Sequence, residues 1–167
     1  MKLSIRYIIF IMVLLFSCSK AEKSNNIESK YLEADIEKWA NYADNVGTDS
    51  DFSHKLVLVT YPTFCGDCLR ELNEWNRRLK VKEFENLDID MIVVDRFKVS
   101  TTNFIDSNEF LFDAKTDTSA QILKLDLIPF IPMKIYFVND EIIKMDRIGN
   151  KPSFDELIKL IKMHQDL

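Results

Sequence analysis

Two cysteines lie three positions apart in the stretch Thr60-Tyr61-Pro62-Thr63-Phe64-Cys65-Gly66-Asp67-Cys68. The residues before them, Lys55 to Tyr61, have an apolar and β-branched centre, which predicts a strand buried on both faces. After them, an apolar stripe recurs at Leu69, Leu72, Trp75 and Leu79. This spacing predicts an amphipathic helix that ends near Lys80. The cysteines are therefore expected where a buried strand gives way to a helix.

A Cys-x-x-Cys pair at the start of a helix has the chemistry of dithiol–disulfide exchange. Unpaired backbone N–H groups and the helix dipole favour an anion at this end, so we expect the pKa of the Cys65 thiol to lie below its ordinary value. Cys65 would attack a substrate disulfide and form a mixed disulfide, and Cys68 would resolve it by closing an intramolecular bond. Cys65 and Cys68 are therefore the candidate catalytic residues.

Gly66 and Asp67 complete the motif between the two cysteines. A carboxylate between the sulfurs opposes thiolate formation, so Asp67 is expected to raise the thiol pKa, with Arg70 as a partial offset. We therefore expect a more reducing pair than one with a basic or neutral residue in place of Asp67.

The rest of the body alternates between strand and helix patterns. Beyond the strand at 55–61, strands are expected at 89–95, 134–138 and 141–148, the last two as an antiparallel hairpin around Asn139-Asp140. Further helices are expected at 28–45, at 118–125 and from Ser153 onward. The polar residues 99–108 predict a loop, and 110–112 a short extended piece. This order predicts an α/β fold, a mixed central β-sheet flanked by helices.

The N-terminus has the pattern of an export signal. The apolar run Ile8 to Phe16 would rise only about 14 Å as a helix, too short for the ~30 Å core of a bilayer. Leu15-Phe16-Ser17-Cys18 resembles a bacterial lipobox, which implies that residues 1–17 are a lipoprotein signal peptide and that Cys18 is lipidated. The alternative is an ordinary secretory signal with an unmodified cysteine. Residues 18–29 are polar and predict a flexible tether.

Three landmarks make the chain resemble the thioredoxin superfamily, in particular the anchored thioredoxin-like and TlpA-like lipoproteins of bacterial envelopes. The first is the stretch 60–68. The second is Ile131-Pro132-Met133-Lys134-Ile135-Tyr136-Phe137, which resembles the family's cis-proline segment and the strand after it. The third is Asn139-Asp140-Glu141 with Gly149, which fall at the family's hairpin turn and closing glycine. The resemblance implies a thioredoxin-like domain over 30–167.

The resemblance also implies a substrate-binding loop. It places the cis-proline at Pro132, which directly precedes a strand, rather than at Pro129. In the family this loop packs against the cysteines and offers backbone groups to the substrate peptide. The groove would be lined by apolar side chains, those of Tyr61, Phe64, Phe130 and Ile131.

Some positions depart from the family's pattern. Val59 stands where thioredoxins usually carry an acid that assists proton transfer to the resolving thiol. Phe64 replaces a tryptophan, and Asp67 replaces a common proline. A helix-kinking proline is absent near Asn73. Partner choice is therefore expected to differ from that of cytosolic thioredoxins.

These features predict a thiol–disulfide oxidoreductase of the bacterial cell envelope, lipid-anchored to a membrane and facing the periplasm. It would reduce disulfides of exported proteins with electrons from an upstream membrane thiol donor. One alternative is an oxidase or isomerase of protein disulfides. The other is a non-catalytic binding module whose cysteines are vestigial or hold a metal ion.

The sequence indicates no cofactor, metal or nucleic acid. Structural zinc needs four ligands, and neither His54 nor His164 has metal-ligand spacing to the cysteine motif. The net charge is −5, which disfavours a nucleic-acid binder that works through a basic surface.

Overall fold

The computed structural model describes residues 31, 36–62, 66–84 and 86–165. The predictions for the signal peptide, for Cys18 and for the tether therefore lie outside the described residues, as do those for Phe64 and Cys65. In the part that is described, no helix has the length and apolar character needed to cross a membrane.

A five-stranded mixed sheet forms the centre of the fold, with the strand order β3-β2-β1-β4-β5. The strands are β1 (His54–Thr60), β2 (Asp88–Val94), β3 (Asp113–Asp117), β4 (Met133–Val138) and β5 (Glu141–Arg147). β1, β2 and β3 run parallel, whereas β4 runs antiparallel to β1 and β5 antiparallel to β4. The central strand β1 is buried at every position after His54, which explains its apolar centre.

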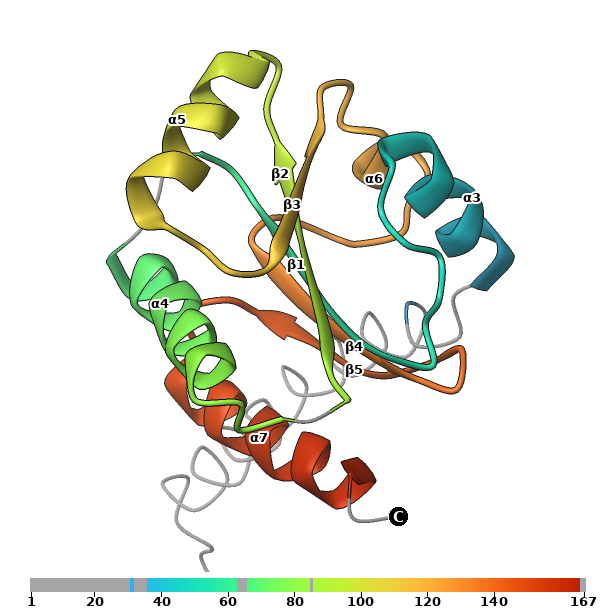
Figure 1. Cartoon of the computed structure of the whole chain (residues 1–167). Helices are drawn as coiled ribbons and strands as arrows, with labels where there is room; N and C mark the ends of the chain where they lie inside the picture. The colour runs from blue at the N-terminus through green and yellow to red at the C-terminus, as the bar shows by residue number, and fades with distance from the viewer. Residues whose placement is uncertain (1–30, 32–35, 63–65, 85, 166–167) are drawn as a thin grey trace, which may run out of the picture.

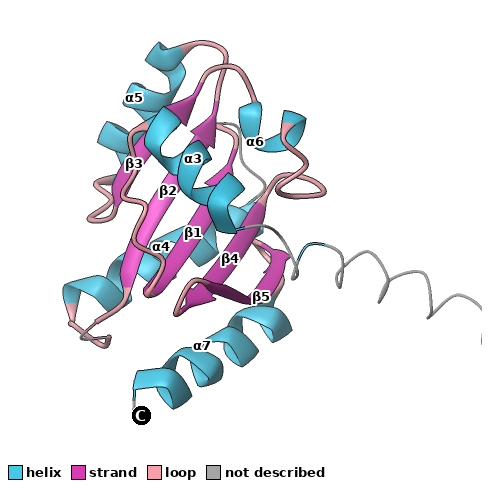
Figure 2. Cartoon of the chain, turned by 90° about the vertical axis from the view of Figure 1, so that its right-hand side faces the viewer, coloured by secondary structure: helices cyan, strands magenta, loops and turns pink. Residues whose placement is uncertain are grey.

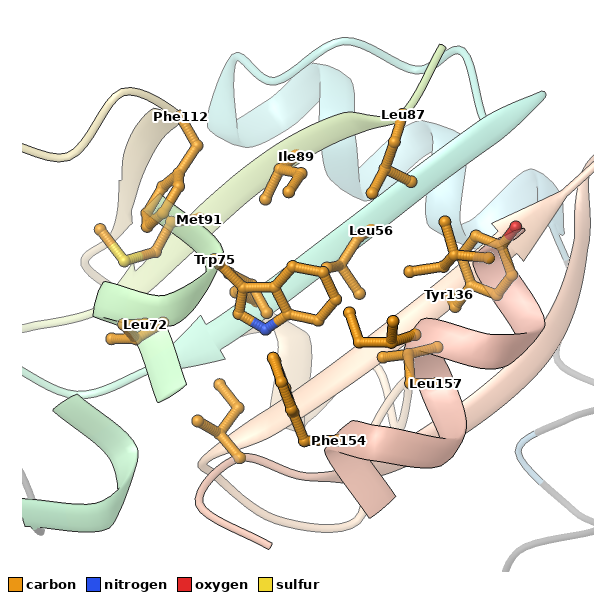
Figure 3. Close-up of a cluster of buried hydrophobic side chains, with 14 of the residues drawn as sticks. Leu56, Leu72, Trp75, Leu87, Ile89, Met91, Phe112, Tyr136, Phe154 and Leu157 are labelled. Carbon is orange, nitrogen blue, oxygen red and sulfur yellow. The ribbon is translucent and has the colours of Figure 1, made fainter. Parts of the chain in front are cut away.

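Helices cover both faces of the sheet (Figure 1). α4 (Gly66–Lys80), α5 (Lys98–Asn108) and α7 (Lys151–Gln165) pack on one face, and α3 (Ile36–Val46) and the short α6 (Gln121–Lys124) lie across the other. Figure 2 shows α3 in front of the sheet with α4 behind it. The α4 and α7 face has a buried cluster in which Trp75 meets Phe154 edge to face, with ring centroids 5.0 Å apart (Figure 3). The predicted mixed sheet flanked by helices is confirmed.

Residues 98–108 form the helix α5, so the polar loop predicted for 99–108 is wrong. Serine, threonine and asparagine are weak helix formers, which is why the local pattern favoured a loop. The buried carboxylate of Asp95 accepts hydrogen bonds from the N–H groups of Phe97 and Thr101, at 2.8 and 3.1 Å, and from the Thr101 hydroxyl. Phe104 anchors the helix in the core. Tertiary contacts thus override the local preference.

The extended piece predicted at 110–112 is also misplaced, because β3 begins at Asp113. Phe110 and Phe112 instead stack on one another, with ring centroids 4.8 Å apart, and contribute to the core. β3 is a polar edge strand, so it carries no apolar alternation that would reveal it.

The C-terminal elements agree more closely with prediction. Asn139 and Asp140 have φ values of 49° and 64° in the turn between β4 and β5, as a tight hairpin turn requires. α7 begins at Lys151, slightly before the expected start, and Pro152 occupies its first turn. The helix expected at 118–125 is shorter, since α6 covers only 121–124.

Candidate active site at the start of α4

Cys68 lies in the first turn of α4, as the motif predicts. It is 4% exposed and disulfide-bonded, and its sulfur lies 3.7 Å from the carbonyl oxygen of Ile148. The other candidate cysteine, Cys65, lies in the undescribed segment 63–65 between β1 and α4. β1 ends before that segment and α4 begins directly after it, so the predicted order of strand, motif and helix is confirmed by the described residues.

The peptide bond between Ile131 and Pro132 is cis, as the family resemblance implies, which settles the choice between Pro132 and Pro129. Met133, the first residue of β4, pairs with Val59 of β1. This register places Pro132 beside the end of β1, from which the chain continues toward the cysteine motif. The cis-proline and Cys68 thus belong to the same end of the sheet, although 64 positions, 132 minus 68, separate them in the sequence.

A third segment, the turn between β5 and α7, packs on the same helix end. Gly149 has a φ of +91°, a region that glycine adopts without strain. Its N–H donates a hydrogen bond of 2.7 Å to Oε2 of Glu71. Ile148, the preceding residue, contributes the carbonyl oxygen near Cys68. Two successive backbone groups of this turn therefore contact the first two turns of α4.

Glu71 belongs to a buried ion pair that was not predicted from the sequence. Its Oε1 lies 2.8 Å from Nζ of Lys134, and the two side chains are 5% and 0% exposed. Trp75, one turn further along α4, donates its indole N–H to the same oxygen at 3.4 Å. A buried carboxylate thus lies one turn from Cys68, whereas the position at which thioredoxins usually carry an acid is occupied by the buried Val59.

Two sequence signals could have revealed this pair. Cys68, Glu71 and Trp75 follow the spacing of one helix face, which places the acid on the buried side of α4. Lys134 interrupts an otherwise apolar strand, and it lies on the same face of that strand as the buried Tyr136. A charge at such a position needs a buried partner of opposite sign.

Charged side chains surround the exposed side of the motif. Asp67 pairs with Arg70, the partial offset that the sequence suggested. A groove of about 460 Å³ lies between α4 and the start of α7, and its charged lining residues are Asp67, Arg70, Glu71, Glu74, Arg78, Lys151 and Asp155. In the described part of the chain, no cluster of His, Cys, Asp or Glu is arranged to hold a metal ion.

Aromatic side chains flank the cis-proline end of the sheet. Tyr61 follows β1 and is 40% exposed, and Phe130, two residues before Pro132, is 39% exposed. The guanidinium of Arg147 lies 4.8 Å from the ring centroid of Phe130. Ile131, which lies between Phe130 and Pro132 in the sequence, is half-buried. Of the four groove residues expected from the sequence, the three that are described are thus at least partly accessible.

No family model matches the chain, and no curated protein does. Solved structures match it well. A candidate thiol:disulfide interchange protein DsbE from Chlorobium tepidum aligns with a TM-score of 0.60 and 13% identity, over 73% of this chain and 83% of that one. An uncharacterized thioredoxin-like protein from Porphyromonas gingivalis aligns with a TM-score of 0.59 and 15% identity, over 71% and 80%. The chain has a thioredoxin-like fold.

A third structure with this fold is that of a secreted Mycobacterium tuberculosis disulfide oxidoreductase homologous to E. coli DsbE. It aligns with a TM-score of 0.53 and 15% identity, over 68% of this chain and 83% of that one. The thioredoxin-like fold accounts for the order of the elements described above, in which β1 leads to the motif helix and a cis-proline precedes the final hairpin and helix.

Proposed function

We propose that this protein is a thiol–disulfide oxidoreductase that reduces disulfides of exported proteins. The observation that carries the proposal is the position of Cys68 in the first turn of α4, at the sheet end that also holds the cis Ile131–Pro132 bond. Solved proteins of the same fold support it, since one is named a secreted disulfide oxidoreductase.

In the proposed reaction, two electrons pass from the dithiol to the substrate. The Cys65 thiolate attacks one sulfur of the substrate disulfide, whose S–S bond breaks and whose other sulfur leaves as a thiolate and takes up a proton. The Cys68 thiol then loses its proton and attacks the Cys65 sulfur of the mixed disulfide, which releases the second substrate thiol. The burial of Cys68 favours this division of labour, because an outside partner reaches a buried sulfur less easily.

The substrate would lie along the cis-proline loop. Pro132 and Ile131 would offer backbone groups to an extended peptide, and Phe64 would add apolar surface beside the nucleophile. Gly66 and Asp67 complete the motif. The carboxylate of Asp67 disfavours a thiolate beside it, which makes the reduced pair less stable and therefore a stronger reductant. A membrane thiol donor would return the Cys65–Cys68 disulfide to the dithiol.

The location we propose is the bacterial cell envelope, with the acyl chains of Cys18 in a membrane and the folded domain facing the periplasm. The support is the lipobox-like stretch before Cys18 and the polar segment 18–29. More than one acyl chain would give stable anchoring without a spanning helix.

Insulin reduction by the full-length chain, with a membrane-impermeant dithiol as electron source, tests the proposal. We expect the wild type to accelerate reduction and Cys65→Ser to abolish the acceleration. Cys68→Ser should accumulate a mixed disulfide between Cys65 and insulin, which a thiol reductant releases. Cys18→Ser is the matched control, which should keep the activity but lose its membrane association. Activity that survives Cys65→Ser, or none in the wild type, would contradict the proposal and favour the binding module.

A further inference from the structure

The buried ion pair between Lys134 and Glu71 connects the cis-proline strand to the motif helix. The ammonium of Lys134 and the backbone N–H of Gly149 occupy different oxygens of the Glu71 carboxylate, at 2.8 and 2.7 Å. The indole N–H of Trp75 adds a longer bond to the first oxygen. Both carboxylate oxygens are therefore engaged, by groups from β4, from α4 and from the turn before α7.

Each end of the pair is a short step from an element of the proposed site. Lys134 is the second residue of β4, two positions after Pro132, and its register partner on β1 is Leu58. Glu71 follows Cys68 by three residues, so both lie on one face of α4. A displacement of the cis-proline segment relative to α4 would stretch a charge-assisted hydrogen bond at a depth where water cannot readily replace it.

Buried ion pairs give little net stability, because the cost of desolvating both charges offsets most of their attraction. An uncharged pair of similar shape would fill the same space. What the charged pair adds is direction, since its hydrogen bonds are satisfied in a narrow range of distance and angle. We propose that Lys134 is a positioning residue for disulfide exchange, which holds the cis-proline segment at a fixed distance from the cysteine motif through Glu71. This inference rests on the proposed function.

The variant Lys134→Met/Glu71→Gln removes both charges while it keeps the shapes of the side chains. We expect its KM for insulin to rise about five-fold or more, with kcat within about two-fold of the wild type, because a displaced loop weakens binding of an extended substrate. Its rate constant with oxidised glutathione should stay within about two-fold, since this small disulfide makes few contacts with the loop. The single variant Lys134→Arg keeps a cation opposite Glu71. Its KM for insulin should therefore lie between those of the wild type and the double variant.

A second buried pair supplies the matched control. Lys55 and Asp90 lie 3.1 Å apart, with side chains 1% and 6% exposed, and they join β1 to β2. Lys55 is near the start of β1, at the opposite end of the strand from the motif. Lys55→Met/Asp90→Asn therefore removes buried charges without touching the proposed site, and we expect its KM for insulin to equal that of the wild type.

Three results would overturn the positioning role: an unchanged KM in the first double variant, an equal rise in the control, or equal losses with insulin and glutathione. A wild type that does not reduce insulin would count against the proposed function instead. Amide hydrogen exchange then decides the inference without activity. Positioning by Lys134 requires faster exchange over 131–134 and 148–150 in the first variant than in the control, and equal exchange would refute it.

Discussion

A β-carbon added to Gly149 would lie 3.2 Å from the backbone nitrogen of Cys68. It would also lie 3.3 Å from Cβ of Asp67, so the turn between β5 and α7 rests on the motif itself rather than on side chains around it. The glycine at this position therefore has a direct physical reason: its missing side chain lets the backbone of the turn approach the backbone of Cys68 in the first turn of α4.

Gly149→Ala should lower the free energy of unfolding by about 2–3 kcal/mol, because the added carbon meets backbone and the φ of +91° disfavours alanine. Gly47→Ala is the control, since Gly47 has a φ of +78° but nothing within 4 Å of the added carbon. It should cost about 1 kcal/mol. Urea unfolding of both variants measures the difference, and equal costs would show that the contact with Cys68 has no energetic weight.

Asp67→Asn should make the cysteine pair less reducing. Removing the negative charge stabilises the thiolate and with it the reduced state, so the equilibrium with glutathione should shift by about three-fold toward the reduced protein. The shift is small because Asp67 is exposed and already paired with Arg70. Asp155→Asn, in the same groove but on α7, should leave this equilibrium unchanged. A shift of the opposite sign for Asp67→Asn would contradict the electrostatic argument.

Phe130→Ala should weaken substrate binding if the cis-proline loop receives the peptide. Loss of one accessible aromatic contact is expected to raise the KM for insulin about five-fold, with little effect on kcat. Met163→Ala removes a more exposed apolar side chain from the last turn of α7 and should leave the KM unchanged. Steady-state kinetics on the two variants compares them, and a similar KM in both would argue against the loop.

Glu74→Gln should alter stability in a pH-dependent way. The hydrogen bond from Arg77, with the charges of Arg78 and Arg77, holds the pKa of Glu74 below its ordinary 4.5. A lowered folded-state pKa contributes stability that is present above 4.5 and is lost as the pH falls through the folded value. The variant should therefore lose about 0.5 kcal/mol at pH 7 and nothing in strong acid. Urea unfolding at both pH values checks this, and a loss that persists in acid would indicate a packing effect instead.

The sequence predicts those parts of the fold whose residues are buried in a regular pattern. β1, β2 and β4 have apolar centres because both of their faces are covered, and α4 has an apolar stripe because one face is. α5 has no comparable pattern, since its start depends on the carboxylate of Asp95 and its polar residues are weak helix formers. Its existence is a property of the assembled structure.

The candidate site shows the same division. The cysteine motif and Pro132 are local patterns and could be identified from the sequence. Glu71 and Lys134 are 63 residues apart, and although their local patterns mark each charge as buried, neither pattern names the partner. Only the sheet register and the packing of α4 bring the two side chains together, so their pairing could not be deduced from local spacing.

Both edge strands of the sheet carry charged side chains. β3 has the sequence Asp-Ala-Lys-Thr-Asp, and β5 carries Glu141, Lys144, Asp146 and Arg147. A strand from a neighbouring molecule could add to either edge only by stripping water from these charges, which discourages strand addition. Many copies of this domain crowded on one surface should therefore remain separate molecules, and fibrous aggregation through the sheet should be disfavoured.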